Sequence, residues 1–155
     1  MSKTNAIRIL EAKNIPHTSR TYFVDENDLS GKTVADKINV KQETVFKTLV
    51  ALGDKNGINV FCIPVTEELN LKKAAVVSGN KSIEMVKVKD LLTLTGYIRG
   101  GCSPIGMKKD YPTFIEETAQ IFDNIYVSAG IRGMQVCLSP EDLKNAVNAA
   151  FADLL

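Results

Sequence analysis

Apolar residues recur every three or four positions in five segments of the chain, the spacing that gathers them on one face of a helix. Thr4, Asn70 and Ser139 precede three of these segments and are residue types that begin helices. Gly79 and Gly96 follow two of them and are typical of helix ends. The predicted helices cover residues 5–12, 32–38, 73–77, 88–95 and 143–155, the last with Ala150 and Phe151 on its buried face.

Shorter runs rich in β-branched and aromatic residues predict strands over residues 19–24, 45–52, 58–65, 124–128 and 134–138. The glycine-bounded segment 53–57 between the second and third runs is typical of a hairpin. Residues 114–122 indicate a strand that turns into a short helix. Because strands and helices alternate without a regular βαβ rhythm, we expect a single α/β domain of the α+β type over residues 1–155. Its central sheet should be mixed, largely antiparallel and surrounded by helices.

Composition sets the class of protein. The chain has 155 residues, 45% of them apolar and 24% charged, with a formal net charge of +1. This balance is that of a globular protein and argues against nonspecific binding of polyanions by the whole surface. No apolar run approaches the roughly 20 residues that span a bilayer, and residues 1–5 lead directly into an amphipathic segment. We therefore expect no membrane association and a cytoplasmic location.

The residues that support common catalytic chemistry are scarce. His17 is the single histidine, which argues strongly against Ser/His/Asp and Cys/His machinery. The three cysteines, Cys62, Cys102 and Cys137, have neither disulfide-framework nor metal-ligand spacing. We therefore expect no metal and no cofactor. Cys102 lies in a glycine-rich loop, but a nucleophilic thiol there would need a base or a positive field.

Lys47 lies within an apolar strand and shares a face with Val45 and Leu49. An ammonium on such a face either opens into a cleft, where it can hold a phosphate, or protects a sheet edge against aggregation. The pattern alone leaves both interpretations open.

The segment 96–106 contains four glycines and one proline, which brings bare backbone close to a neighbour. It is either a tight connection or a binding loop with exposed N–H groups. Arg132, between Gly130 and Gly133, and Ser128, at a strand end, carry the same two alternatives: a ligand contact or an ordinary turn.

Taken in order, five segments resemble one family: residues 46–49, 69–75, 95–97, 100–106, and 125–128 with the glycines and arginine that follow. The chain resembles the YbaK-type Cys-tRNA(Pro) deacylases, in the superfamily of prolyl-tRNA synthetase editing domains, over essentially its whole length. The resemblance implies a trans-editing enzyme that removes cysteine mischarged onto proline tRNA, with Cys-tRNA(Cys) as a further candidate substrate. Its partners would be the acceptor end of tRNA and prolyl-tRNA synthetase.

The resemblance also implies roles for residues. Lys47, Gly100 and Gly101 correspond to catalytic positions: the lysine holds the terminal adenosine, and the glycine backbone contacts the aminoacyl group. The positions that correspond to substrate-binding residues are Tyr22, Phe46, Thr48, Ser103, Pro104, Ser128 and Arg132. The family mechanism is attack by the substrate's own thiol on its ester, which needs neither histidine nor an enzyme cysteine. Two positions depart from the relatives: Cys102 replaces an aliphatic residue, and Gln135 an acid found in some of them.

Two other functions remain open. The pocket could accept another small amino acid such as alanine, since the sequence does not fix its size. Alternatively, the chain could be a noncatalytic module that binds tRNA or a nucleotide.

Overall fold

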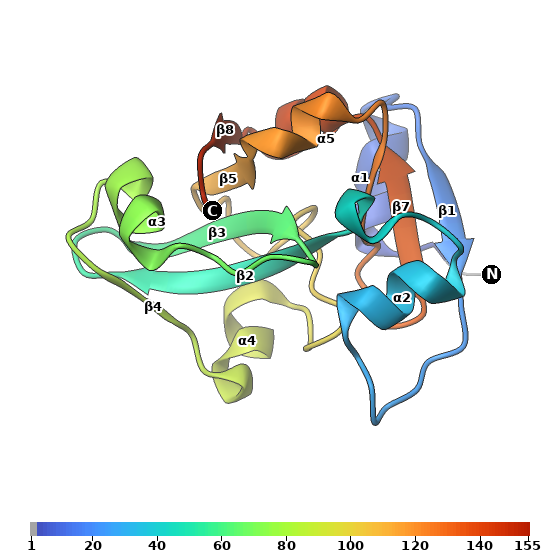
Figure 1. Cartoon of the computed structure of the whole chain (residues 1–155), viewed down its shortest axis with the longest axis horizontal. Helices are drawn as coiled ribbons and strands as arrows, with labels where there is room; N and C mark the ends of the chain where they lie inside the picture. The colour runs from blue at the N-terminus through green and yellow to red at the C-terminus, as the bar shows by residue number, and fades with distance from the viewer. Residues whose placement is uncertain (1–2) are drawn as a thin grey trace.

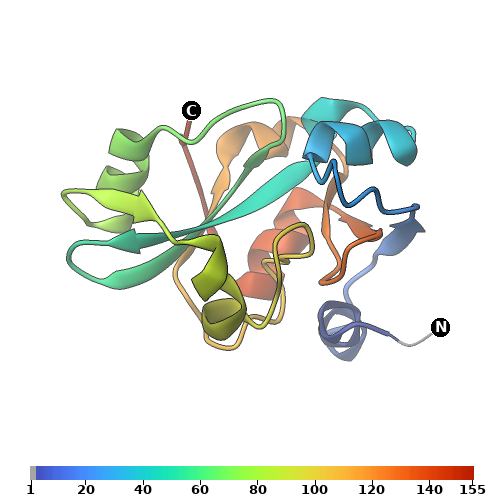
Figure 2. The ribbon, with the colours of Figure 1, turned by 90° about the horizontal axis from the view of Figure 1, so that it is seen from below.

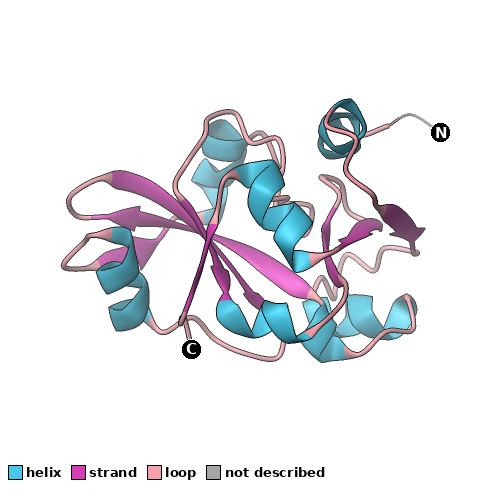
Figure 3. Ribbon diagram, turned by 90° about the horizontal axis from the view of Figure 1, so that it is seen from above, coloured by secondary structure: helices cyan, strands magenta, loops and turns pink. Residues whose placement is uncertain are grey.

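Two β-sheets lie side by side in the computed structural model, which describes residues 3–155 (Figure 1). The larger has the strand order β4-β2-β3-β5-β8 and the smaller has the order β1-β7-β6. The helices lie around these strands (Figure 3). The predicted α/β class with mixed, largely antiparallel pairing is confirmed, but the strands are divided between two sheets.

The hairpin of β2 (Phe46–Gly53) and β3 (Gly57–Pro64) is the centre of the larger sheet, with antiparallel pairing from Phe46↔Pro64 to Gly53↔Gly57. β4 (Ile83–Met85) pairs antiparallel with the far end of β2. On the other side, β5 (Thr113–Glu116) and β8 (Ala150–Ala152) add parallel strands. In the smaller sheet, β7 (Met134–Leu138) pairs antiparallel with both β1 (Thr18–Thr21) and β6 (Ile125–Ser128).

Within residues 3–155, four of the five α-helices begin at a residue whose side chain caps them. The hydroxyls of Thr4, Ser30 and Ser139 and the amide oxygen of Asn70 each accept a hydrogen bond from a backbone N–H of the first turn. Most element boundaries therefore agree with the sequence to within two residues. The helices are α1 (Asn5–Ala12), α2 (Gly31–Lys37), α3 (Leu71–Ser78), α4 (Val88–Thr95) and α5 (Pro140–Val147), with short 3-10 turns η1 (Gln42–Thr44) and η2 (Glu117–Ile121).

Two predicted elements are longer than the real ones. The strand predicted over residues 19–24 ends at Thr21, because its partner β7 begins at Met134, opposite Thr21. The helix predicted over residues 143–155 ends at Val147, because Asn148 takes the left-handed conformation (φ 53°) and turns the chain. The chain then forms β8 beside β5, so Ala150 is exposed and not on a buried helix face.

The two sheets pack on a shared hydrophobic core that includes Cys62 of β3 and Val127 of β6, and they meet along a seam. Val45 forms a parallel bridge with Tyr126 of the smaller sheet, just before β2 turns into the larger one. Figure 2 shows β2 running from the larger sheet toward α2 and the smaller sheet. β4 pairs with β2 only at residues 51–53, so within residues 3–155 the edge of β2 between that contact and Val45 lacks a strand partner. The candidate site lies against this open edge, because residues 45–49 line its cavity.

Candidate active site

A cavity of about 450 Å³ lies at the seam between the two sheets. Small-molecule sites in proteins have volumes of several hundred Å³. The charged side chains that line the cavity are all cationic: Lys32, Lys47 and Arg99. Its uncharged lining comes from the start of α2, from residues 45–49, from the smaller sheet and from the glycine-rich segment 96–106, here called the glycine loop. These residues are Leu29, Ser30, Gly31, Val34, Val45, Phe46, Thr48, Leu49, Val65, Gly100, Cys102, Ser128 and Gln135.

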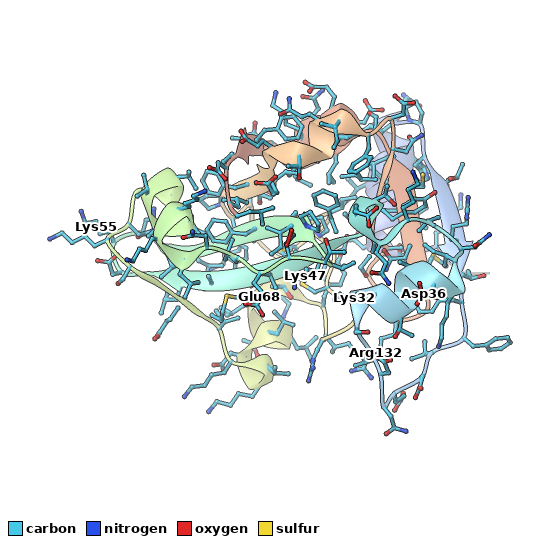
Figure 4. The ribbon with its side chains drawn as sticks, viewed as in Figure 1. Lys32, Asp36, Lys47, Lys55, Glu68 and Arg132 are labelled. Carbon is cyan, nitrogen blue, oxygen red and sulfur yellow. The ribbon has the colours of Figure 1, made fainter. Side chains whose placement is uncertain are left out.

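Lys47 lies on the part of β2 that has an open edge, and it is half-buried. Within residues 3–155, no hydrogen bond or ion pair holds its ammonium group. Burial lowers the pKa of Lys47 below its ordinary value of 10.5; nearby Glu68 opposes this shift, and Lys32 adds to it. Figure 4 shows Lys47 between Glu68 and Lys32. Because Lys47 lies both on a sheet edge and in a cavity, the two interpretations left open by the sequence do not exclude each other.

The two adjacent glycines differ in their surroundings. Gly100 lines the cavity in the left-handed conformation (φ 84°), and a Cβ there would lie 3.2 Å from Arg132 Nε and 3.3 Å from Leu29 Cδ1. Gly101 does not line it. A Cβ on Gly101 would lie 3.0 Å from the backbone of Ile131, and its N–H already donates to the carbonyl of Ile98 (2.9 Å). Gly100 therefore faces the cavity, whereas Gly101 packs against the β6–β7 loop.

Tyr22 and Arg132 line a recess of about 10 Å³ beside the cavity. The recess shares Leu29, Val34 and Gly100 with the cavity. Arg132 Nε donates to the carbonyl of Arg99 (2.8 Å), and its guanidinium lies 3.8 Å from Glu26. The arginine therefore ties the β6–β7 loop to the glycine loop at the edge of the cavity.

Of the remaining expected substrate-binding residues, Phe46, Thr48 and Ser128 line the cavity, whereas Ser103 and Pro104 do not. Ser103 is fully buried, and its hydroxyl accepts a hydrogen bond from the N–H of Ile105 (3.2 Å). Pro104 lines a separate cavity beside α1. The chain turns after Cys102, so the structure brings the first part of the glycine-rich segment to the cavity and carries the second part away from it.

Two of the three cysteine thiols are poor nucleophiles. Burial raises the pKa of Cys102 to about 11 and that of Cys62 to about 12, so both thiols stay protonated near neutral pH. His17 Nδ1 lies 2.8 Å from the carbonyl of Ile15 and does not line the cavity. Residues 3–155 contain no group of three or more His, Cys, Asp or Glu side chains arranged to hold a metal ion.

Sequence reasoning missed part of the cavity wall. The first turn of α2 contributes Gly31 and Lys32, and the smaller sheet contributes Gln135. A Cβ on Gly31 would overlap the side chain of Val65, so this glycine lets α2 approach the strand end. A glycine directly after the capping Ser30 was the available signal. Gln135 was noted only as a departure from the relatives, because strand alternation does not say what a face covers.

No helix within residues 3–155 has the length and apolar character needed to cross a membrane.

The comparison with protein families decides the class. Residues 27–146 match the family described as the aminoacyl-tRNA editing domain. This chain belongs to that family. The matched residues include the start of α2, the whole of β2 with Lys47, the glycine loop and Gln135, which together surround the cavity.

Similar proteins agree with this membership. The chain is 48% identical over 152 residues to a protein of Enterococcus faecalis named "Putative Cys-tRNA(Pro)/Cys-tRNA(Cys) deacylase EbsC", covering 98% of this chain and 93% of that one. One solved structure, a hypothetical protein APE2540, has a TM-score of 0.88 at 20% identity over 97% of this chain and 99% of its own. Another, titled as a putative trans-editing enzyme for prolyl tRNA synthetase, has a TM-score of 0.83 at 21% identity over 99% and 98%. These two structures support the fold.

Proposed function

We propose that this editing domain is a trans-editing deacylase that releases cysteine from mischarged Cys-tRNA(Pro). The observation that carries the proposal is the half-buried, unpaired ammonium of Lys47 in a cavity whose charged lining is entirely cationic. Such a cavity favours an anionic ligand group, and the 3′ end of tRNA supplies a phosphate beside the aminoacyl ester. The 48% identity to a protein named as a Cys-tRNA deacylase supports the choice of cysteine.

In the proposed reaction, the nucleophile comes from the substrate. The thiol sulfur of the bound cysteine attacks its own ester carbonyl, a C–S bond forms, and the bond from the carbonyl carbon to the ribose oxygen breaks. The thiol proton is transferred to that leaving oxygen, and the cysteine leaves as a cyclic thiolactone that water opens. An intramolecular thiol held within reach of its target can have an effective concentration of about 10⁵ M or more.

The residues around the cavity then have distinct tasks. Lys47 holds the phosphate, and the positive field of Lys32, Lys47 and Arg99 favours the substrate thiolate and the oxyanion that forms. Gly100, which faces the cavity, supplies the backbone N–H for the ester oxygen. Gly101 supports Gly100 by its close packing on the β6–β7 loop. Phe46, Thr48 and Ser128 surround the aminoacyl group, while Tyr22 and Arg132 shape the edge next to it.

The near-neutral chain limits affinity for tRNA through phosphate contacts alone. We therefore propose that residues 1–155 act as one editing domain in the cytoplasm, in a complex with tRNA(Pro) and prolyl-tRNA synthetase. Such a complex raises the effective concentration of the mischarged end at the cavity. The proposal assigns no step to a metal or a cofactor.

A deacylation panel tests the function. We expect cysteine to be released from Cys-tRNA(Pro) much faster than alanine or serine from the same tRNA, with thiolactone detectable among the products by mass spectrometry. Equal release of alanine or serine would eliminate self-attack by the thiol. Binding of all three charged tRNAs without release would instead show a noncatalytic module.

The role of Lys47 is tested by Lys47→Ala. We expect it to reduce kcat/KM for Cys-tRNA(Pro) by about 10- to 150-fold while the protein stays folded, because a charge-assisted contact is lost. Lys55→Ala is the matched control, since Lys55 lies in the exposed β2–β3 turn, far from Lys47 (Figure 4). Near-normal turnover by Lys47→Ala would refute the assignment.

A further inference from the structure

Lys47 has the surroundings of a reactive amine as well as those of an anion contact. Its side chain is half-buried and lines the cavity of about 450 Å³, and within residues 3–155 its ammonium group has no hydrogen-bond or ion-pair partner. Several other lysines donate to a carboxylate or a carbonyl: Lys3, Lys13, Lys37, Lys73 and Lys144. The nitrogen of Lys47 is therefore not engaged by another part of the described chain.

The protonation of Lys47 favours such reactivity. A lysine amine is a nucleophile only in its neutral form, which burial and a neighbouring cation promote. Burial lowers the pKa of Lys47 and the like charge of Lys32 adds to the shift, whereas Glu68 and Glu67 oppose it. Both glutamates are exposed and lie outside the cavity lining. A larger fraction of Lys47 is therefore neutral near pH 8 than of a fully solvated lysine.

The charges of the cavity bring anions to this amine. Lys32 and Arg99 line it from two different segments, the first turn of α2 and the glycine loop. Within residues 3–155, neither side chain is in an ion pair. A cleft lined by charges of one sign raises the local concentration of the opposite ion by about 10- to 1000-fold at low ionic strength. An anion that enters the cavity therefore meets a cationic wall that contains a partly neutral amine.

These two properties together select one class of reagent. An acyl phosphate combines a phosphate group, which the cationic lining attracts, with a carbonyl carbon that amines attack. A neutral ester has the carbonyl without the charge, and inorganic phosphate has the charge without the carbonyl. The volume of the cavity is that of a small-molecule site, so a small acyl phosphate fits in it.

We propose that Lys47 is a site of covalent acylation by small acyl phosphates, of which acetyl phosphate is the simplest. The neutral Nζ attacks the carbonyl carbon, a C–N bond forms, and the C–O bond to the phosphate breaks. The phosphate leaves with the electron pair of that bond, and the nitrogen releases one proton to water. The product is an amide at Lys47, which carries no charge.

Acylation changes the chemistry of the cavity. The amide removes one of the three cationic groups of the lining, so an anionic ligand is bound less tightly. The modification itself needs no aminoacyl ester, but its effect on deacylation rests on the proposed function. In that function, the release of cysteine should fall in proportion to the fraction of Lys47 that is acylated. The activity of the domain would then respond to the concentration of acyl phosphates.

Peptide mapping by mass spectrometry tests the modification without an activity assay. The protein is incubated with acetyl phosphate at pH 8 and low salt, and acetylation is followed at Lys47, Lys32 and Lys55. Lys55 is the internal control, because it lies in the exposed β2–β3 turn, far from the cavity (Figure 4). We expect the initial rate at Lys47 to exceed the rate at Lys55 by about tenfold or more.

A neutral reagent separates the recruitment of the anion from the reactivity of the amine. p-Nitrophenyl acetate carries the same acetyl group without a phosphate, so its preference for Lys47 over Lys55 should be about threefold or more below that of acetyl phosphate.

Arg99→Gln removes a charge of the lining and keeps the backbone carbonyl that accepts from Arg132 Nε. We expect this variant to slow acetylation of Lys47 by acetyl phosphate about threefold or more, and to leave its rate with p-nitrophenyl acetate within about twofold.

Three results would each overturn the inference. They are equal rates at Lys47 and Lys55, faster acetylation of Lys32 than of Lys47, and the same preference for Lys47 with both reagents.

The fate of the proposed function is read separately. Acetylation of Lys47 in a wild-type protein that releases no cysteine from Cys-tRNA(Pro) would refute the function and leave the modification standing. Full release of cysteine after complete acetylation of Lys47 would refute the role of this lysine in the reaction, but not its modification. Release of cysteine by a protein whose Lys47 is acetylated no faster than Lys55 would refute the modification alone.

Discussion

The carboxylate of Glu116 accepts a hydrogen bond from the backbone N–H of Leu154, 38 residues further along the chain, with an oxygen–nitrogen distance of 3.0 Å. Its other oxygen accepts from the N–H of Thr118 (2.7 Å), and the side chain is 1% exposed. Leu154 is itself fully buried among residues that pack on the larger sheet. Glu116 therefore fastens the residues after β8 to the sheet.

Removal of this carboxylate should destabilise the protein. Glu116→Ala leaves two backbone N–H groups without their acceptor, and we expect a loss of about 2–4 kcal/mol in the free energy of unfolding, measured by urea denaturation. Glu117→Ala is the matched control, because the neighbouring Glu117 is exposed. If the two variants unfold at the same urea concentration, Glu116 is not a tether.

Gly100 and Gly57 form a natural pair for separating backbone strain from the function of the cavity. Their φ angles are 84° and 82°, but a Cβ on Gly57 would meet nothing within 4 Å, whereas Gly100 lines the cavity. We expect Gly57→Ala to cost about 1–2 kcal/mol of stability, from the left-handed backbone alone. Gly100→Ala should cost at least as much, because its Cβ would also lie 3.2 Å from Arg132 Nε and 3.3 Å from Leu29 Cδ1. Only Gly100→Ala should also reduce the release of cysteine from Cys-tRNA(Pro). Equal activity in the two variants would exclude Gly100 from the reaction.

The pKa of Lys47 predicts how phosphate binding depends on pH. Burial lowers this pKa below 10.5, so the ammonium is fully charged below the lowered pKa and neutral above it, with Glu68 and Glu67 opposing and Lys32 supporting the shift. Binding of 5′-AMP, followed by calorimetry from pH 8 upward, should therefore weaken at a lower pH than an ordinary lysine would give. The phosphate is already a dianion over this range, so its charge does not change.

Lys47→Arg supplies the control for that titration, because a guanidinium stays charged throughout. Its AMP binding should not weaken over the same pH range. Parallel losses in the wild-type protein and in Lys47→Arg would show that a different group titrates.

Cys102 should be dispensable for deacylation. With a pKa of about 11, on the order of one thiol in ten thousand is ionised at pH 7. We expect Cys102→Ser to keep kcat/KM for Cys-tRNA(Pro) within about threefold of the wild-type value. An inactive Cys102→Ser that remains folded would restore covalent catalysis by the enzyme.

Signals that act within a few residues predicted local structure well. The capping residues Thr4, Asn70 and Ser139 begin helices as expected. Gly53 and Gly57 lie at the two ends of the β2–β3 turn, as the hairpin prediction requires. Asn148 was missed because asparagine tolerates the left-handed conformation without requiring it, and the β5 edge that favours β8 is distant in sequence.

The site was predictable where the sequence constrained a residue strongly. An unpaired lysine in an apolar strand and a pair of glycines were visible as anomalies, and the structure places Lys47 and Gly100 in one cavity. Ser103 and Pro104 share the glycine-rich segment, but a turn of the chain takes them elsewhere. Gln135 stood out only as a departure from the relatives, since strand alternation does not say which side chains line a cavity.

The bridge between Val45 and Tyr126 has a consequence for how selectivity can change. Neither sheet alone determines the width of the cavity, because one wall comes from β2 and the other from the smaller sheet. The main hydrophobic core joins residues of both sheets, among them Ile115 of β5 and Val136 of β7. Changes in its volume can shift these walls relative to each other without touching a cavity residue. Mutations deep in the packing below β7 or β3 are therefore a route by which such a domain can acquire a different amino-acid preference while its lining stays the same.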